Sequence, residues 1–311
     1  MNDISGSDKI LTAEILRRLG HPMALLLLTG FIWAGNTIAG RLLVGEASPM
    51  AITTFRWLIS FFLLSLFVRN DVKAMLPLFR TRALYLIVMG FIGFTGFNAV
   101  YYYAAQFTYA VNLGIMQSST PIFVMLGAAL VQKIRVTPGQ IAGLVAGIIG
   151  VLWVASAGRW EVIRTLDFNR GDVMILTVSA LYASYSLGLK HRPDNISGIG
   201  FFAAMAAVAV VTSLPLLALE MAQGAFKWPT LKGWVIIAWV GVFPSLLAQI
   251  WYIRAIVALG PTRSGFIFNL IPVFAALQAV VLLGEPFGWH HAIGLALVLG
   301  GIAWAERHKG Y

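Results

Sequence analysis

The chain has 311 residues, of which 59% are hydrophobic and only 11% are charged. Soluble domains carry about 25% charged residues, so this composition excludes an ordinary soluble protein and indicates a polytopic membrane protein. The chain contains no cysteine, which excludes disulfides and thiolate metal sites. The net charge of +10 does not indicate a nucleic-acid partner, because Lys and Arg concentrate in the cytoplasmic loops of membrane proteins.

Ten apolar segments, each close to the length of about 20 residues that a bilayer requires, predict an all-α fold of ten transmembrane helices. Glycine, proline and charged residues separate the segments, and several of them begin at or near a proline, which the first turn of a helix tolerates. In chain order the predicted spans are 22–43, 49–68, 83–107, 110–132, 138–157, 171–189, 198–219, 231–259, 261–284 and 287–304.

The spans divide the chain into two halves. We expect an N-terminal tail at 1–21, a first five-helix unit at 22–157, a polar connector at 158–170, a second five-helix unit at 171–304 and a C-terminal tail at 305–311. With the N-terminus inside, fifteen Lys and Arg residues fall in cytoplasmic segments, six fall outside, and Arg56 lies within a span. This bias predicts that both termini are cytoplasmic and that the connector is periplasmic.

The second half repeats the first. When residues 98–153 are moved forward by 151 positions they fall on 249–304, and this offset pairs Tyr101 with Tyr252 and Pro121 with Pro272. Five spans per half force the two copies into opposite orientations. An inverted pair of bundles can rock around a site between them, which is the architecture of a secondary transporter.

Three stretches carry a family resemblance: WAGNTIAGR (33–41), PMAITTFRW (49–57) and NAVYYYAAQFTYAVNLGIMQSSTPIFVMLGAAL (98–130). They resemble the EamA-type repeat of the drug/metabolite transporter superfamily, and the aromatic-rich interior is most similar to its aromatic-amino-acid exporter branch. The resemblance covers 22–304 and implies two inverted five-helix repeats in a bacterial inner membrane that export amino acids and related metabolites. The chain departs from the pattern at Lys133 and Ile134, where the first repeat often has Gly-Glu, which leaves Glu285 as a lone, structural acid.

Polar and aromatic residues within the spans fall in register with the repeat. Asn98 matches Gln249, and each amide lies near a tyrosine on the same helix. An amide and a phenol can bind the charged groups of a zwitterion while aromatic rings hold its side chain; the alternative is ordinary hydrogen bonding between helices. The predicted substrate-binding residues are Trp33, Asn36, Arg56, Asn98, Tyr101, Tyr102, Gln117, Tyr182, Tyr185, Gln249, Tyr252 and Asn269.

Arg56 is a charged residue within a span. It could attract a substrate carboxylate, extend outward to the membrane surface, or cap carbonyls of a neighbouring helix. Helix-disrupting residues predict where the bundle bends, at Gly93, Pro121, Pro244 and Pro272. These positions could be hinges or static kinks.

All twelve carboxylates and all five histidines fall in tails, loops or span ends. Proton-coupled carriers keep such groups at membrane depth, so we expect a facilitative exporter working by alternating access. The same pattern argues against an enzyme, and neither a metal nor a cofactor is expected. The alternative is a multidrug or other small-metabolite exporter, with proton coupling left open; a receptor or a pore would need features that the sequence lacks. The expected partners are a small-molecule substrate and the lipid bilayer, with a monomer favoured over a dimer.

Overall fold

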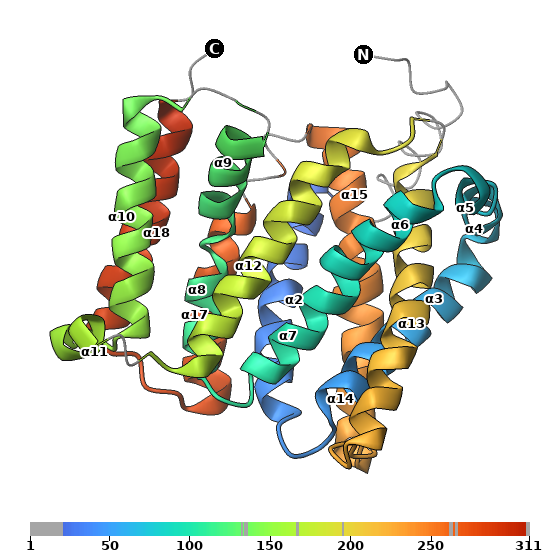
Figure 1. The fold of residues 1–311 in the computed structure, drawn as a ribbon, viewed down its shortest axis with the longest axis horizontal. Coiled ribbons are helices and arrows are strands. Elements are labelled where there is room, and N and C mark those ends of the chain that lie inside the picture. The colour runs from blue at the N-terminus through green and yellow to red at the C-terminus, as the bar shows by residue number, and fades with distance from the viewer. Residues whose placement is uncertain are drawn as a thin grey trace.

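The computed structural model describes residues 21–131, 133, 136–165, 168–194, 196–260, 264 and 267–308, and over these residues it contains helices and no strand. Long helices run side by side between two ends of the molecule (Figure 1). Helix α2 (Pro22–Leu42) begins and α18 (Trp289–Arg307) ends at the top of that view. We call this the upper end and the opposite one the lower end.

Eight helical segments are long and apolar enough to cross a membrane, and Ile267–Leu283 is a shorter apolar helix, so the chain is a polytopic membrane protein. The eight segments are Pro22–Leu42, Pro49–Phe67, Ala83–Ala104, Ala110–Val131, Pro138–Ala155, Arg170–His191, Gly198–Ala222 and Leu231–Leu259. Each coincides with a predicted span. The predicted span 287–304 overlaps α18, which begins at Trp289 and is not among these eight. The ten-span count and the inverted orientation of the halves therefore stay predictions, and residues 261–263, 265 and 266 of the predicted span 261–284 lie outside the described residues.

Several of these segments are divided into shorter helices. The labelled elements are α3 (Pro49–Phe67), α4 (Arg69–Met75), α5 (Leu78–Thr81), α6 (Ala83–Gly90), η1 (Phe91–Gly96), α7 (Phe97–Ala104), α8 (Ala110–Gln117), α9 (Thr120–Val131), α10 (Pro138–Ala155), α11 (Trp160–Thr165), α12 (Arg170–Gly188), η2 (Leu189–His191), α13 (Gly198–Ala222), α14 (Leu231–Val242), η3 (Phe243–Leu247), α15 (Ala248–Leu259) and α17 (Ile267–Leu283). The loop helices α4 and α5 are absent from the sequence prediction, and α11 lies within the predicted connector with no buried residue.

Two π-helical turns interrupt the helices at positions that the repeat matches. Turn η1 contains Gly93 and turn η3 contains Pro244, which the 151-residue offset pairs. A third interruption separates α8 from α9 just before Pro121, while α17 continues through Pro272 without a break. Three of the four predicted bending positions therefore coincide with irregular backbone. π-turns and helix breaks are often found at functional sites.

The ends of the helices follow from local sequence signals. Thr137, Ser197 and Thr230 each precede a helix, and their hydroxyls accept hydrogen bonds from the N–H groups three residues later. Gln140 completes a capping box by accepting from the N–H of Thr137 at 2.9 Å. These caps satisfy backbone donors that a helix leaves unpaired at its start.

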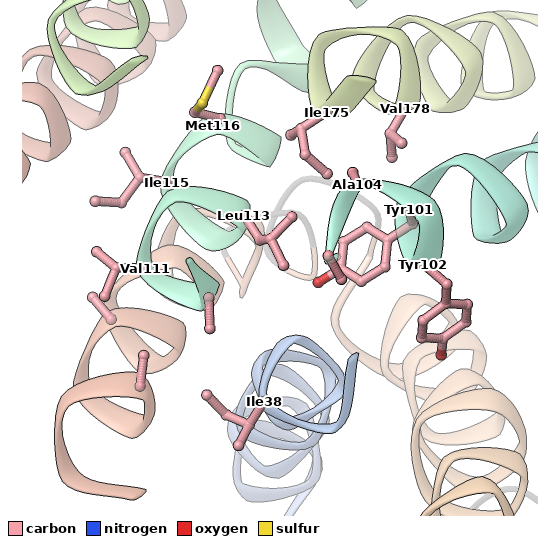
Figure 2. Close-up of a cluster of buried hydrophobic side chains, with 14 of the residues drawn as sticks. Ile38, Tyr101, Tyr102, Ala104, Val111, Leu113, Ile115, Met116, Ile175 and Val178 are labelled. Carbon is pink, nitrogen blue, oxygen red and sulfur yellow. The ribbon is translucent and has the colours of Figure 1, made fainter. Parts of the chain in front are cut away.

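A buried cluster lies where α2, α7, α8 and α12 meet. Figure 2 shows part of it, with Leu113 and Tyr101 close to Ile175. Ile38 of α2 completes this part of the cluster. Because lipid is as apolar as these side chains, close van der Waals packing rather than escape from water holds the helices together. This packing fixes α7, which carries several of the predicted site residues.

Helices α10 and α18 form an antiparallel pair through glycines. A Cβ at Gly143 would lie 2.3 Å from the carbonyl oxygen of Gly301, and one at Gly150 would lie 2.7 Å from that of Gly294. In the repeat, Gly143 is equivalent to Gly294 and Gly150 is equivalent to Gly301. The contact of Gly143 with Gly301 and that of Gly150 with Gly294 are therefore equivalent to each other. These glycines of α10 therefore pack within this chain.

Candidate functional site

A cavity of ≈ 550 Å³ lies within the helical bundle. At its deep end the wall contains Arg56 and Asn98, and toward the upper end it contains Gln140, Ala305 and Glu306. Gln140 lies at the start of α10 and Glu306 near the end of α18, both at the upper end. The cavity therefore extends from the interior toward the end of the bundle where α2 begins.

Most of the predicted site residues line this cavity. They are Trp33, Asn36, Arg56, Asn98, Gln117, Tyr182, Tyr185, Gln249 and Asn269, together with all four predicted bending positions, Gly93, Pro121, Pro244 and Pro272. Among the wall residues, Asn98 and Gln249 are matched by the repeat, as are Trp33 and Tyr182. Both halves of the chain thus contribute equivalent positions to one wall.

Three predicted residues are not on the wall. Tyr101 is 1% exposed, belongs to the core cluster of Figure 2, and donates to Oγ1 of Thr37 at 2.9 Å. Tyr102 is also buried, and its hydroxyl oxygen accepts from Arg56. Tyr252 packs behind the wall, with its ring centroid 5.2 Å from that of Trp33. These three support wall residues, and the structure does not bring them to the cavity surface.

The Arg56 guanidinium lies at the deep end of the cavity and is 4% exposed. Its Nη1 atom lies 2.6 Å from Oδ1 of Asn98, 2.6 Å from the hydroxyl of Tyr102 and 3.3 Å from Oδ1 of Asn36. Its Nε and Nη2 atoms lie 2.9 and 2.6 Å from Oγ of Ser245. Side chains hold the guanidinium inside the bundle, so it neither extends to the membrane surface nor caps backbone carbonyls.

Proline explains why Ser245 is placed to hold Arg56. Pro244 has no N–H and so leaves the carbonyl of Val240, four residues earlier, without its helical partner. The hydroxyl of Ser245 donates to this carbonyl at 2.7 Å, which orients its oxygen as an acceptor for Arg56. The carbonyl of Pro244 in turn accepts from Nε1 of Trp33 at 3.1 Å. The proline therefore organises one side of the site.

Aromatic rings form much of the remaining wall. Trp33 stacks on Phe268 with their centroids 5.8 Å apart. On another part of the wall Tyr182 lies 5.4 Å from Phe97 and 5.6 Å from Tyr185. Ring pairs at these separations are favourable and rigid. Such a surface suits a ligand with a flat, apolar body.

Three amide side chains on the wall have no hydrogen-bond partner among the described residues: those of Gln117, Gln249 and Asn269. Buried amides in a membrane protein usually bond to a neighbouring helix. Amides that are left without one can bond to water or to a ligand in the cavity.

The lower end is closed by polar contacts between the two halves. The carboxylate of Glu46 accepts from Thr230 and forms an ion pair with Lys232 at 3.1 Å. The hydrogen bond from Thr230 and the neighbouring charge of Lys232 lower the pKa of Glu46 below its ordinary value. The backbone N–H of Ser48 donates to the carbonyl of Lys227 at 3.2 Å. Loop residues of the first half are thus fastened to the loop before α14.

Glu285 makes a second contact between the halves at the lower end. Its two carboxylate oxygens each accept from a backbone N–H at 2.9 Å, those of Ala110 and Val111 at the start of α8. Nε of Arg41 lies 3.7 Å from the same carboxylate. A negative charge at a helix N-terminus is stabilising. The expected structural role of this acid agrees with its position.

The described acids lie in loops, in short loop helices or near the ends of spans, as predicted, but the sequence gives no sign that some of them are buried. Glu220, in the last turn of α13, is 2% exposed and accepts from Met50 N–H and the hydroxyl of Tyr103. Asp172, in the first turn of α12, is also 2% exposed and accepts from Thr108 at 2.5 Å. All of these lie at the lower end, away from the cavity wall.

Sequence reasoning missed Trp57, Phe94 and Ser245. Trp57 and Phe94 line the cavity, with their ring centroids 4.8 Å apart, while Ser245 binds Arg56 from behind the wall. A polar residue directly after a mid-span proline is a signal that could have indicated Ser245. Aromatic residues are too frequent in this chain for sequence alone to separate the two rings from the others.

Comparison with known proteins follows the same division into halves. The EamA-like transporter family matches residues 21–156 and 169–306. The uncharacterized transporter YyaM of Bacillus subtilis (strain 168) is 28% identical over 299 residues, which cover 92% of this chain and 94% of that protein. The uncharacterized transporter YetK of the same organism is 24% identical over 272 residues, which cover 87% of this chain and 82% of that protein. An uncharacterized transporter of Archaeoglobus fulgidus is 24% identical over 294 residues, which cover 92% of this chain and 98% of that protein. A solved crystal structure matches with a TM-score of 0.57 over 91% of this chain and 96% of that chain; at 17% identity this likeness shows the fold alone.

Proposed function

The chain belongs to the EamA-like transporter family, and from this premise we propose that it exports amino acids, aromatic and other neutral ones, and related metabolites across a bacterial inner membrane. In this proposal the upper end is cytoplasmic, as the distribution of Lys and Arg predicts. The protein is a multi-pass transporter of small molecules rather than an enzyme, which agrees with the names of its relatives.

The observation that carries the proposal is the joint wall built by both halves. Asn98 and Gln249, which are equivalent in the repeat, face one cavity together with Arg56 and rings such as Trp33 and Tyr182. A guanidinium binds carboxylates, amides bond to polar groups, and rings pack against an apolar side chain. This combination suits a compound that is polar at one end and flat and apolar at the other.

Alternating access explains how one cavity could serve both sides of a membrane. The lower end is held closed by contacts such as Glu46 with Lys232 and Glu285 with α8, while the wall reaches the upper end at Gln140 and Glu306. Release of substrate to the lower side requires these contacts to break and the cavity to close at the upper end. The π-turns at Gly93 and Pro244 lie beside the cavity, where such a change would bend the helices.

We propose that transport is facilitative. Among the described wall residues there is no histidine, and the one carboxylate, Glu306, lies exposed at the upper end rather than at the depth of Arg56. A proton relay needs a titratable group that reaches the substrate or the membrane interior. Dependence of the flux on an imposed pH gradient would contradict this part of the proposal.

Counterflow in proteoliposomes tests the proposed function. Vesicles are loaded with one unlabelled amino acid at a time, and entry of labelled phenylalanine is followed with and without a pH gradient. We expect exchange that survives collapse of the gradient and falls strongly in Gln249→Ala. Gln106→Ala is the matched control, because Gln106 is exposed in the loop after α7 and should leave the exchange unchanged.

The alternative is a multidrug or other small-metabolite exporter, and a specific part of the cavity favours it. Toward the upper end the wall is apolar and includes Ile122, Met125 and Leu144. Such a surface could accept varied apolar compounds without the amides. Absence of exchange with every amino acid, together with transport of an apolar drug that is insensitive to Gln249→Ala, would favour this alternative.

A further inference from the structure

The charges in the cavity point to a narrower substrate class. Resting on the proposed function, we propose that among amino acids and related metabolites the preferred substrate is an aromatic carboxylate that lacks an ammonium group, and that each such molecule exported carries one negative charge out of the cell. The inference depends on which groups surround Arg56 and which groups are missing at its depth.

Arg56 is a buried cation whose described partners are all neutral. Its hydrogen-bond acceptors are a serine hydroxyl, a tyrosine hydroxyl and two asparagine oxygens, and none of them is a carboxylate. Removing a cation from water without an opposite charge is strongly unfavourable. Nη2 carries two N–H groups, but it bonds only to Ser245, so one donor has no described acceptor. A substrate carboxylate would supply both the missing charge and an acceptor.

A substrate ammonium group would find no matching charge at this depth. Arg56 and Glu306 are the charged residues of the described wall. Arg56 lies seven residues from the start of α3, about 10 Å into the bundle from the lower end by helix rise, whereas Glu306 lies in the last turn of α18 at the upper end. In an α-amino acid one carbon separates the carboxylate from the ammonium group. An ammonium beside Arg56 therefore meets a like charge and no described carboxylate, which disfavours a zwitterion.

Aromatic rings lie directly beside the guanidinium. The Cζ atom of Arg56 is 5.2 Å from the ring centroid of Trp57. The ring centroid of Phe94 lies 4.8 Å from that of Trp57 and 5.6 Å from that of Tyr185, so these rings continue the wall. The indole N–H of Trp57 is buried and has no hydrogen-bond partner among the described residues. A carboxylate at Arg56 would thus have its aromatic body against these rings.

Charge also determines how such a substrate would leave the cell. A monovalent anion moves outward with the electrical force wherever the cell interior is negative. If Arg56 does not itself cross the membrane, each anion exported carries one net charge. Export could then proceed without a proton relay, in agreement with the lack of a deep carboxylate or histidine in the described wall.

The test compares phenylpyruvate, phenylalanine and phenethylamine, which share a phenyl ring and differ in charge. Vesicles containing the wild-type protein are loaded with one labelled compound and with potassium, and net efflux is measured with valinomycin, with and without an outward potassium gradient. Protein-free vesicles give the passive leak. We expect protein-dependent phenylpyruvate efflux to exceed that of phenylalanine at least about tenfold, the factor that corresponds to about 1.4 kcal/mol. A potassium gradient that makes the interior negative should accelerate phenylpyruvate efflux, and phenethylamine should not be transported.

The outcomes separate this inference from the proposed function. Phenylalanine efflux that exceeds phenylpyruvate efflux and ignores the potential would overturn the inference and leave amino-acid export intact. Phenylpyruvate efflux that is equally fast with and without the potential would overturn the charge stoichiometry. Transport of none of the three compounds would overturn the proposed function itself.

Two substitutions of Arg56 add a test at the residue level. Arg56→Lys keeps the charge and should retain the preference for the anion at a reduced rate, whereas Arg56→Gln should lose the preference for the anion over the other two compounds. Arg164→Gln, on the exposed helix α11, is the control. Arg56→Gln could fail to fold, but the comparison of the three compounds uses the wild-type protein and does not depend on that variant. An anion preference that survives in a folded Arg56→Gln protein would contradict the assignment of Arg56.

Discussion

Two nitrogen atoms of Arg56 share one acceptor, the hydroxyl oxygen of Ser245, at 2.9 Å from Nε and 2.6 Å from Nη2. Arg56 belongs to α3 in the first half of the chain, and Ser245 belongs to the π-turn η3 in the second half. The same guanidinium also bonds to Asn98, in the first turn of α7 directly after η1. A ligand that binds Arg56 would therefore change contacts at both π-turns, which offers a physical route from substrate binding to helix movement.

Ser245→Ala should destabilise the protein and slow transport. The substitution removes the acceptor of two Arg56 N–H groups and the hydroxyl that donates to the carbonyl of Val240. Loss of a buried hydrogen-bond partner costs about 1–3 kcal/mol. Thermal unfolding in detergent and counterflow rates measure the two effects. Ser184→Ala is the matched control, because its exposed hydroxyl bonds only within its own helix, to Ala180; equal behaviour of the two variants would show that Ser245 does not hold Arg56.

Gly93→Ala should disturb the site through a steric clash. A Cβ at Gly93 would lie 2.4 Å from Cδ2 of Tyr185, closer than two carbon atoms can approach. Overpacking of this kind costs about 1–3 kcal/mol, so we expect a lower melting temperature and reduced transport. In Gly300→Ala the added Cβ has no atom within 4 Å, and this control should be neutral or stabilising. Tyr185→Ala removes all three atoms that this Cβ would meet, so Gly93→Ala should cost less stability in a Tyr185→Ala background than in the wild-type protein. An unchanged cost would contradict the proposed clash.

Helical periodicity and hydropathy predict most of the fold because membrane helices require long apolar segments. The helix starts predicted at Pro22, Pro49 and Pro138 agree with the structure, because proline fits the first turn of a helix. The π-turns could not be located to a residue, since they depend on packing around Gly93 and Pro244 as well as on local sequence. Helices α4 and α5 escaped prediction because they are too short to show a clear period.

The repeat was the most useful sequence signal for the site, because equivalent residues of two related halves meet at their interface. Asn98 and Gln249 were found in this way, and both line the cavity. Tyr101 and Tyr252 were chosen by the same reasoning but lie off the wall, because spacing along a helix fixes a face only approximately and the neighbouring helices decide which part of it is covered. Ser245 was missed because its role depends on Arg56, a contact between residues 189 positions apart.

In the Glu285→Gln protein the lower end should be open more often than in the wild-type protein. In glutamine an NH2 donor replaces one carboxylate oxygen and the charge is lost, so one of the N–H groups of Ala110 and Val111 faces a donor in place of its present acceptor. Loss of a helix N-terminal cap costs about 0.5–2 kcal/mol, which would increase the open population several-fold. The chain has no cysteine, so Ala110→Cys, at a fully buried position, provides a single reporter for a maleimide that does not cross the membrane.

We expect faster labelling of this reporter in Glu285→Gln than in the parent Ala110→Cys protein. Glu161→Gln, on the exposed helix α11, is the control and should leave the rate unchanged. Labelling that is equally slow in Glu285→Gln would show that Glu285 stabilises α8 without holding the lower end closed.

The contact of Glu46 with Thr230 and Lys232 should give the lower end a dependence on pH. Hydrogen bonding to Thr230, followed by the interaction with Lys232, lowers the pKa of Glu46 from its ordinary value of 4.5. A carboxyl group with a lowered pKa stabilises the closed arrangement fully above its ordinary pKa, and the stabilisation is lost as the pH falls through the lowered value. Closure should therefore be constant from neutral pH to about pH 5 and weaken below about pH 4.

Spin labels at Val44→Cys and Gln223→Cys, both exposed in loops of the lower end, report on this change through their separation. We expect the distance distribution to broaden toward longer values in acid. Other carboxylates lie at this end, namely Glu220, Glu285 and Asp172, so Glu46→Gln is needed as the comparison. In that variant the distribution should already be broader at neutral pH, and the acid-dependent change should be smaller. If the wild-type protein and Glu46→Gln respond identically to acid, another carboxylate controls the opening, and the Glu46–Lys232 pair is a surface ion pair with little effect on closure.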